Sequence, residues 1–480
     1  MRFEIGPLVI LSYHCFVLHV LDRYREFTDI DALKEFSIKP LRESIRVNAL
    51  KMTVAEFLEK ARARDWTVSP VPWCPEGFFI DDARGETVGR DLLHRTGHFY
   101  MQEAASMLPV ALLDPKPGET VLDLCAAPGS KTTQIASMMQ GKGVIIANDV
   151  QEKRLWVLRS SLQRMGVTNV IITKRVGQGF ARLVEQFDRV LCDAPCTALG
   201  TSRKDSDALL KMHDSGVKKL SAIQFQLLET AIHAAKVGGR IVYSTCTLTW
   251  EENEQLVLEI LNKFGDQVSV FDAGINSNLS LAIDDSKLLQ EKTGITKQPQ
   301  PFVRLWPHRY DTEGFFCAVL EKRAPTKPMV PLDRVPFLQT PLSIQEQRKI
   351  RSELEDDFGA PILREDEELF IAKDQISALT SEAASFLLPF QNYALGLPFG
   401  RIRDGHIRLS HETVLLRGLE AKKNIHAVTK EELDALFRGQ LVPCLASMRG
   451  DVVLAFDGMA LGIGMAKDGS VRHRFPKYFL

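Results

Sequence analysis

The segment Thr120-Val-Leu-Asp-Leu-Cys-Ala-Ala-Pro-Gly-Ser-Lys131 joins a predicted apolar strand to a glycine-containing loop, and a predicted helix follows. Two further apolar runs, 189–193 and 239–243, are also predicted strands, and they lead into the motifs Asp193-Ala-Pro-Cys196 and Ser244-Thr-Cys246. Ligands of open α/β sheets bind at the carboxyl ends of the strands. We therefore expect the three loops to face one crevice.

The region around these loops alternates predicted strands with predicted helices, which is typical of βαβ units. The last strand follows a stretch containing proline and glycine rather than a helix, so we expect it to enter antiparallel at the edge of the sheet. Seven strands with one reversed predict a Rossmann-like α/β sheet of the class I methyltransferase type. The predicted strands are Thr120–Leu124, Gly143–Asn148, Asn169–Thr173, Arg189–Cys192, Arg240–Tyr243, Val268–Phe271 and Phe315–Leu320.

The length of 480 residues predicts several domains. We expect an N-terminal α+β region at 1–100, the methyltransferase-like core at 101–323, a proline-rich linker at 324–342, an α+β connecting region at 343–395 and a β-rich domain at 396–480. The apolar stretch Leu8–Leu21 is too short to span a bilayer, and we interpret it as a buried first helix rather than a signal segment.

The net charge and the cysteine content limit the kinds of partner and the cellular compartment that we expect for the protein. The formal net charge is −1, so a polyanionic partner must be met by local basic patches. The eight cysteines lack the spacing of a disulfide framework or of a zinc site, which favours a reducing, cytoplasmic location and argues against a metal.

The loop after the first strand predicts a nucleoside ligand without a pyrophosphate. It is not a Walker loop, because Ser130 separates Gly129 from Lys131, and no G-x-G-x-x-G motif is present. Asp149 ends the second strand, where a carboxylate can hold both ribose hydroxyls, although it could instead only cap the next helix. S-adenosyl-L-methionine fits this pattern, and Asp123 is a candidate partner for its positively charged end.

The two cysteine motifs add a chemical step to the methyl donor. If their strands are neighbours, Cys196 and Cys246 both overlook the ligand crevice, although either could be a buried structural cysteine. C5 of a pyrimidine becomes nucleophilic only after a nucleophile such as a thiolate adds at C6. Asp193 could hold N3 and the exocyclic amine of the base. Spacing alone leaves open which cysteine attacks.

Six ordered motifs closely resemble those of the NOP/SUN-domain RNA cytosine-C5 methyltransferases, over about residues 40–322. They are Cys125–Lys131, Asp193–Cys196, Arg203-Lys-Asp205, Tyr243–Thr247, Glu251–Glu254 and Glu313–Phe316; 45–48 and 100–107 are also similar to upstream motifs of the family. The length and the glycine-rich, basic end resemble the bacterial branch that modifies 16S ribosomal RNA and carries a PUA-like tail.

This resemblance implies a role for each matching residue. Cys246 would be the nucleophile, Cys196 would assist release of the product, and Asp193 would hold the base. The cofactor would be bound by Asp149, Asp193 and the loop residues Cys125, Ala126, Ala127, Pro128, Gly129, Ser130 and Lys131. Our candidate RNA contacts are Arg46, Arg203, Lys204, Arg472, Arg474 and Lys477. We expect a monomer that acts on RNA, namely 16S ribosomal RNA or the small ribosomal subunit, without a membrane association.

One position departs from the family pattern. An acidic residue that usually contacts adenine after the third strand is replaced by Val176. Either Gln178 or a backbone amide substitutes for it, or the affinity for the methyl donor is lower. This departure keeps a non-catalytic RNA-binding or ribosome assembly factor open as an alternative. A tRNA cytosine-C5 methyltransferase is another, and a DNA methyltransferase is disfavoured because no large target-recognition insertion separates the motifs.

Overall fold

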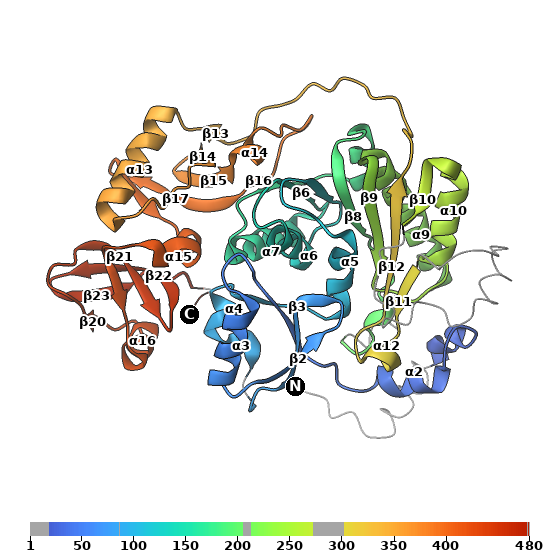
Figure 1. The fold of residues 1–480 in the computed structure, drawn as a ribbon, viewed down its shortest axis with the longest axis horizontal. Helices are drawn as coiled ribbons and strands as arrows, with labels where there is room; N and C mark the ends of the chain where they lie inside the picture. Colours follow the sequence, from blue (N-terminus) through green and yellow to red (C-terminus); the bar gives the residue numbers. More distant parts are fainter. Residues whose placement is uncertain (1–18, 86, 205–212, 272–301, 478, 480) are drawn as a thin grey trace.

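The computed structural model describes residues 19–85, 87–204, 213–271, 302–477 and 479. A large central sheet with its helices forms the body of the molecule, the N-terminal sheet lies against it, and two small C-terminal sheets lie on the side opposite α10 (Figure 1). Among the described residues, no helix combines the length and apolarity needed to cross a membrane. Most of the predicted Leu8–Leu21 helix falls outside the described residues.

The central sheet has the order β10-β12-β9-β8-β5-β6-β7-β16, with β11 also paired to β12. Strands β5 to β9 pair in parallel, and β12 is antiparallel to β9. The bounds are β5 Thr120–Asp123, β6 Val144–Asn148, β7 Val170–Thr173, β8 Phe187–Asp193, β9 Ala235–Thr245, β10 Val268–Val270, β11 Phe302–Leu305, β12 Phe315–Lys322 and β16 Ala394–Leu395. The Rossmann-like sheet is therefore confirmed, but within the described residues it has nine strands rather than seven, because β11 and β16 join it, and β16 is reversed as well as β12.

The predicted edge position of the last strand is wrong. Strand β12 lies inside the sheet, between β9 on one side and β10 with β11 on the other. Its side chains are buried almost throughout, as expected of a strand that is paired on both sides and covered on both faces. The apolar run Phe315–Leu320 was therefore the better guide to its position than the missing helix before it.

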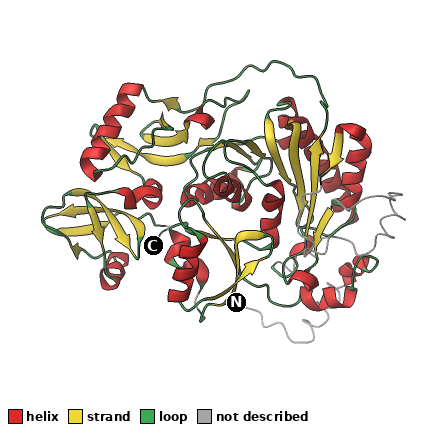
Figure 2. Ribbon diagram, in the orientation of Figure 1, coloured by secondary structure: helices red, strands yellow, loops and turns green. Residues whose placement is uncertain are grey.

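Helices cover both faces of the sheet (Figure 2). Neighbouring residues of β5 enter different apolar clusters, Leu122 with α9 and α10, and Val121 with α5, α6 and α7, because successive side chains of a strand point to opposite faces. The bounds are α5 Leu108–Leu113, α6 Ser130–Met138, α7 Glu152–Met165, α9 Asp214–Ala234, α10 Glu254–Phe264 and α12 Pro307–Tyr310; the short 3₁₀ segments are η3 Ala105–Met107, η4 Gly177–Arg182, η5 Leu199–Thr201 and η6 Gly265–Gln267.

The N-terminal region is an α+β unit built on a sheet of order β2-β3-β1-β4. Its apolar core includes Phe57, Phe78 and Phe99, which come from α3, β3 and β4. The segment before β1 packs elsewhere, with Tyr24 against Trp306 of the core. The bounds are η1 Val20–Tyr24, α2 Ile30–Ser37, β1 Ser44–Val47, α3 Val54–Ala63, β2 Thr67–Val71, β3 Cys74–Asp82, η2 Val88–Arg90, α4 Leu92–Arg95 and β4 Phe99–Met101.

Two sheets, β13-β14-β15-β17-β18 and β19-β21-β22-β23-β20, form the C-terminal part. The first sheet crosses the domain boundary expected at residue 395, because β17 pairs with β15, and β13 lies within the expected linker. The bounds are β13 Thr340–Pro341, α13 Ile344–Phe358, β14 Glu367–Ala372, β15 Gln375–Thr380, α14 Ser381–Ala384, β17 Leu397–Arg403, β18 His406–Leu409, α15 His411–Arg417, η7 Gly418–Glu420, β19 Ile425–Ala427, α16 Lys430–Phe437, β20 Val442–Pro443, β21 Gly450–Phe456, β22 Met459–Lys467 and β23 Ser470–His473.

Candidate active site

The two cysteine motifs meet at the carboxyl ends of β8 and β9. These strands are parallel neighbours, with Asp193 opposite Ser244 in the register. The Sγ atoms of Cys196 and Cys246 lie 3.3 Å apart, and both cysteines are free and partly buried. The structure thus brings together the two thiols that the sequence placed at neighbouring strand ends.

The two thiols are not equivalent. The hydrogen bond with Cys246, followed by burial, raises the pKa of Cys196 well above its ordinary value. Cys196 therefore stays protonated at neutral pH and can donate its S–H to the sulfur of Cys246. In this protonation state Cys196 is the donor of the hydrogen bond and the sulfur of Cys246 is the acceptor.

The buried carboxylate of Glu252 holds the two cysteine loops together. It accepts hydrogen bonds from the Thr197 amide at 3.0 Å and the Thr197 hydroxyl at 2.5 Å, next to Cys196. Thr249, shortly after Cys246, donates to it at 2.6 Å, and Gln224 of α9 donates at 2.8 Å. The sequence marked the run Glu251–Glu254 as a motif, but it could not show which of its carboxylates points inward.

Asp193 is paired with Lys131 across the ends of two strands. The Lys131 Nζ lies 2.8 Å from Asp193 Oδ2, and the Ser244 hydroxyl donates to Asp193 Oδ1 at 2.8 Å. Burial alone would lower the pKa of Lys131, but the negative charge of Asp193 and its hydrogen bond to Lys131 outweigh it and raise that pKa. A cation thus lies near both the Asp193 carboxylate and the sulfur of Cys246.

The motif Glu313–Phe316 is a third segment that packs against the two cysteine loops. The Gly314 amide donates to the Gly200 carbonyl, and the Gly200 amide donates to the Cys246 carbonyl. A Cβ at Gly314 would lie 2.8 Å from a Leu248 methyl carbon, so only glycine fits this close approach. Burial and then Glu103 raise the pKa of Glu313 to about 8, which keeps its buried carboxyl group neutral at pH 7.

The predicted cofactor loop follows β5 and leads into α6. Gly129 has a φ of +105°, and an added Cβ would lie 3.0 Å from Leu158 of α7. Glycine is therefore required both by the left-handed backbone and by the contact with the next helix. The Ala126 amide donates to the Asn148 carbonyl at 2.7 Å, which joins the loop to the end of β6.

Two buried carboxylates beside this loop have oxygens without a hydrogen bond among the described residues. Asp123 Oδ2 accepts from Thr132 at 2.7 Å, but Oδ1 has no partner. Asp149 Oδ1 accepts from the Gln151 amide at 2.9 Å, and Arg154 lies 3.3 Å from Oδ2, which accepts no hydrogen bond. Asp149 lies two residues before Gln151, the N-cap of α7. Such orphaned oxygens fit a ligand with hydroxyl groups and a positive charge, as S-adenosyl-L-methionine has.

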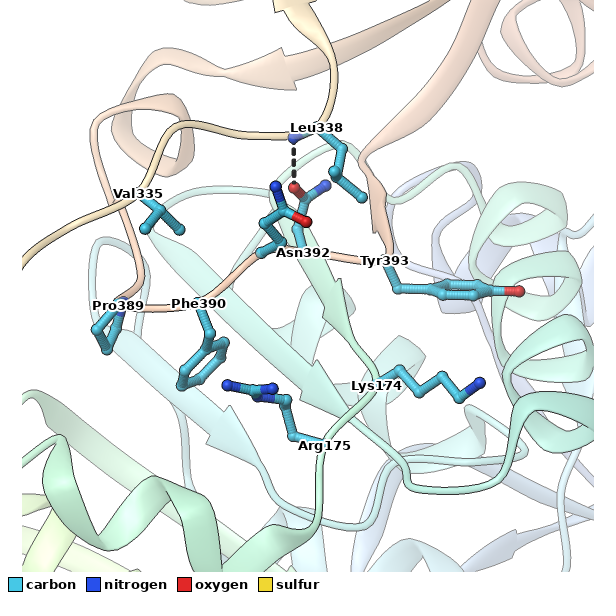
Figure 3. A pocket seen from close by; sticks show the side chains of 9 residues that line it. Lys174, Arg175, Val335, Leu338, Pro389, Phe390, Asn392 and Tyr393 are labelled. Atoms are coloured by element: carbon cyan, nitrogen blue, oxygen red, sulfur yellow. Dashed lines mark hydrogen bonds between the residues drawn. The ribbon is translucent and has the colours of Figure 1, made fainter.

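The segment after β7, which carries Val176, is covered by the C-terminal region. Val176 is 61% exposed, and the preceding Arg175 lies over the Phe390 ring at 4.6 Å. Figure 3 shows Arg175 directed toward Phe390 in a cavity of about 510 Å³. The cysteines, Asp123 and Asp149 do not line this cavity, so it is separate from the thiol site.

Two of the predicted RNA contacts are wrong for this conformation. Arg46 is 1% exposed and donates to Gln102 and Thr133, which ties β1 to α6. The Arg203 side chain is also 1% exposed and pairs with Asp311 at 2.8 Å. Both guanidinium groups bind residues of neighbouring segments instead of facing solvent. These arginines lie where two segments of the chain pack together, and a sequence pattern does not reveal such a position.

The other predicted contacts, Lys204, Arg472, Arg474 and Lys477, are exposed. The ring of Phe475, which lies between Arg474 and Lys477 in the sequence, is not exposed, since it is buried against Phe479 and Phe437 in the core of the last sheet. Tyr478 lies outside the described residues. The basic side chains of the tail therefore remain candidate RNA contacts without Phe475 as a stacking partner.

The Rossmann-like sheet, the glycine loop at its first strand and the paired cysteines together define a class I S-adenosylmethionine-dependent methyltransferase fold. The family model described as 16S rRNA methyltransferase RsmB/F matches residues 110–321, and that of the N-terminal domain of 16S rRNA methyltransferase RsmF matches residues 19–104. The chain belongs to the RsmB/F family of RNA methyltransferases, which use S-adenosyl-L-methionine.

Individual relatives agree with this assignment. The chain is 34% identical to ribosomal RNA small subunit methyltransferase F of Aliivibrio fischeri (strain MJ11), over 92% of this chain and 91% of the relative. For the protein of the same description from Escherichia coli O157:H7 the identity is 35%, over 92% and 90%. Among solved structures, a methyltransferase homolog from Pyrococcus horikoshii is 33% identical with a TM-score of 0.55, over 66% of this chain and 100% of that chain.

We predict that cofactor affinity depends on pH through Asp123. Burial raises the pKa of Asp123 to about 7, so this carboxyl group is neutral below that pH and ionises above it. A cationic ligand binds the ionised form, so affinity should rise by up to about tenfold per pH unit toward pH 7 and then level off. Isothermal titration of S-adenosyl-L-methionine at several pH values measures this.

The Asp123→Asn variant should bind more weakly and lose this part of the pH profile, whereas Asp266→Asn, at an exposed position, should keep the wild-type profile. An unchanged profile in Asp123→Asn would show that another group controls binding.

We also predict that Glu252→Gln slows methyl transfer about 100-fold, because an amide nitrogen cannot accept the hydrogen bonds that align the two thiols. Cofactor affinity should not change, since Glu252 does not touch the glycine loop. Single-turnover kinetics with radiolabelled S-adenosyl-L-methionine measures the rate. The neighbouring Glu251→Gln is the matched control, and equal rates for the two variants would contradict the role of Glu252.

Proposed function

We propose that this chain transfers the methyl group of S-adenosyl-L-methionine to C5 of a cytosine in RNA through a covalent bond between Cys246 and C6. The observation that carries the proposal is the pair of thiols 3.3 Å apart, one of which is held protonated, beside the Lys131–Asp193 ion pair. A methyltransferase that acts on an oxygen or an amine would have no use for two such thiols.

In the first step the charged sulfur of Cys246 adds to C6, and the C5–C6 electron pair becomes available at C5. Negative charge develops on the ring at N3 and O2, where the ammonium group of Lys131 can stabilise it. Asp193 accepts a hydrogen bond from the exocyclic amine and so orients the base. S-adenosyl-L-methionine, when bound, supplies an electrophilic methyl group to C5.

In the second step the base must lose its C5 proton, and the bond between C6 and the Cys246 sulfur must then break. Once Cys246 is bonded to C6, its sulfur carries no charge, and the main cause of the raised pKa of Cys196 is gone. Cys196 can then release its own proton to solvent water, and the resulting thiolate takes the C5 proton. The electron pair of the broken C5–H bond restores the C5–C6 double bond and expels the Cys246 thiolate.

We further propose that the RNA is 16S ribosomal RNA. The support is the description of the curated relatives as ribosomal RNA small subunit methyltransferases, together with their match over nine-tenths of both chains. The target base must be unpaired or flipped out of a helix to reach the cysteines.

Val176 favours one second candidate, a non-catalytic RNA-binding factor, because the family's usual acidic contact to adenine is missing there. The carboxylate oxygens of Asp123 and Asp149 that accept no hydrogen bond argue against a non-catalytic factor, since they are available to bind the cofactor. The absence of any S-adenosyl-L-methionine binding in a titration would favour this candidate.

Bisulfite sequencing of ribosomal RNA from cells with and without the protein should identify one or a few cytosines whose methylation depends on it. Complementation with Cys246→Ala should not restore the mark, whereas Cys192→Ala, a cysteine buried inside β8, should. Cys196→Ala should accumulate a denaturation-resistant protein–RNA adduct. An adduct from the Cys246 variant instead, or from neither, would overturn the assignment of the two thiols.

A further inference from the structure

A groove of about 730 Å³ lies where the methyltransferase core meets both C-terminal sheets. Its walls come from α7, the β17–β18 hairpin, the start of α15 and the segment after β23, and α7 contacts both β17 and α15. Five arginines line the groove, namely Arg159, Arg401, Arg403, Arg408 and Arg474.

The carboxylates around the groove do not satisfy these arginines. Arg408 and Arg474 share the single carboxylate of Asp451, at 3.5 and 3.0 Å, and both side chains remain more than 40% exposed. The contact of Arg401 with Asp374 is long, at 3.8 Å, and exposed on both sides, so it contributes little.

The remaining acids of the lining are Asp404 and Glu412, and Glu412 also acts on the buried Lys51. Arg159 and Arg403 form no ion pair within the described part of the chain. Five guanidinium groups thus face four carboxylates, counting Asp374 and Asp451, and two of the five are unpaired. The excess of planar, unengaged N–H donors suits the oxygens of phosphodiesters.

Helix α7 connects this groove to the candidate active site. Trp156, Arg159, Ser160 and Gln163 are spaced i, i+3, i+4 and i+7 and therefore share one face of the helix. Trp156 is 60% exposed, which is unusual for a tryptophan on a helix of the core. The helix begins at Glu152, just beyond Asp149, so this face runs about 16 Å from the cofactor end to the groove.

An exposed aromatic ring next to a basic groove is the combination that binds single-stranded nucleic acid, with stacked bases and a neutralised backbone. We propose that the groove binds the sugar-phosphate backbone of a single-stranded segment of the substrate RNA that flanks the target base, and that Trp156 stacks on one base of this segment. The proposal rests on the proposed function, because it takes RNA as the substrate.

The test compares RNA binding and methyl transfer of the full chain with those of the double variant Arg159→Gln/Arg403→Gln. A transcript of 16S ribosomal RNA is titrated at several salt concentrations. Loss of two phosphate contacts should reduce the slope of log K against log salt by about 1.4 and raise the KM for RNA, with kcat and cofactor affinity unchanged. Trp156→Ala should weaken binding about tenfold without changing the slope.

The double variant Arg348→Gln/Lys349→Gln removes the same charge from the exposed face of α13, and it should bind RNA like the wild type. If the two double variants had equal salt slopes and equal KM values while the wild type methylated the RNA, the proposal that the groove binds RNA would be overturned. A defect confined to assembled subunits, with normal binding of the transcript, would also overturn it and point to an acidic protein partner. If the wild type made no 5-methylcytosine but the salt slope of Arg159→Gln/Arg403→Gln still fell, the proposed function would be contradicted. The proposal that the groove binds RNA would then still be supported.

Discussion

A single buried carboxylate determines how the catalytic loops are arranged. Glu252 is fully buried and would be very unfavourable there without partners, so the protein supplies four donors, two from Thr197 and one each from Thr249 and Gln224. These donors belong to the Cys196 loop, the Cys246 loop and α9. Satisfying the charge therefore fixes the two loops relative to each other and brings their sulfur atoms into contact.

The electrostatics of the site follow from the parallel sheet. Strands β5, β6, β8 and β9 end side by side, so Asp123, Asp149, Asp193 and the thiols gather at one edge. Lys131 lies beside Asp193 there, and Arg154 lies beside Asp149. Burial draws Asp123 toward its neutral form, the hydrogen bond with Cys246 and then burial do the same for Cys196, and Asp193 keeps Lys131 charged against the effect of burial. One arrangement thus provides a cation-binding carboxylate, a protonated thiol and a sulfur able to carry charge.

The sequence predicted the strands of the core and the meeting of the two cysteine motifs, because both depend on local apolar runs and on strand adjacency. Predictions from the sequence were wrong where the position of a residue or strand depends on packing against distant segments of the chain. Nothing local distinguishes Arg46 and Arg203, which are buried at junctions, from exposed basic residues, and nothing singled out Glu252 within its acidic run. The inner position of β12 and the sheet that crosses residue 395 likewise depend on strands far away in the chain.

The central claim is that Cys246 bonds to C6 of a cytosine while Cys196 acts on release. Incubation of the wild-type protein with RNA that contains 5-fluorocytidine tests it most directly, because fluorine at C5 cannot leave as a proton and the adduct should persist. Digestion and mass spectrometry should find the methylated base attached to the peptide that carries Cys246. A base attached to Cys196, or methyl transfer to ordinary cytosine with no adduct on the fluorinated RNA, would contradict the account.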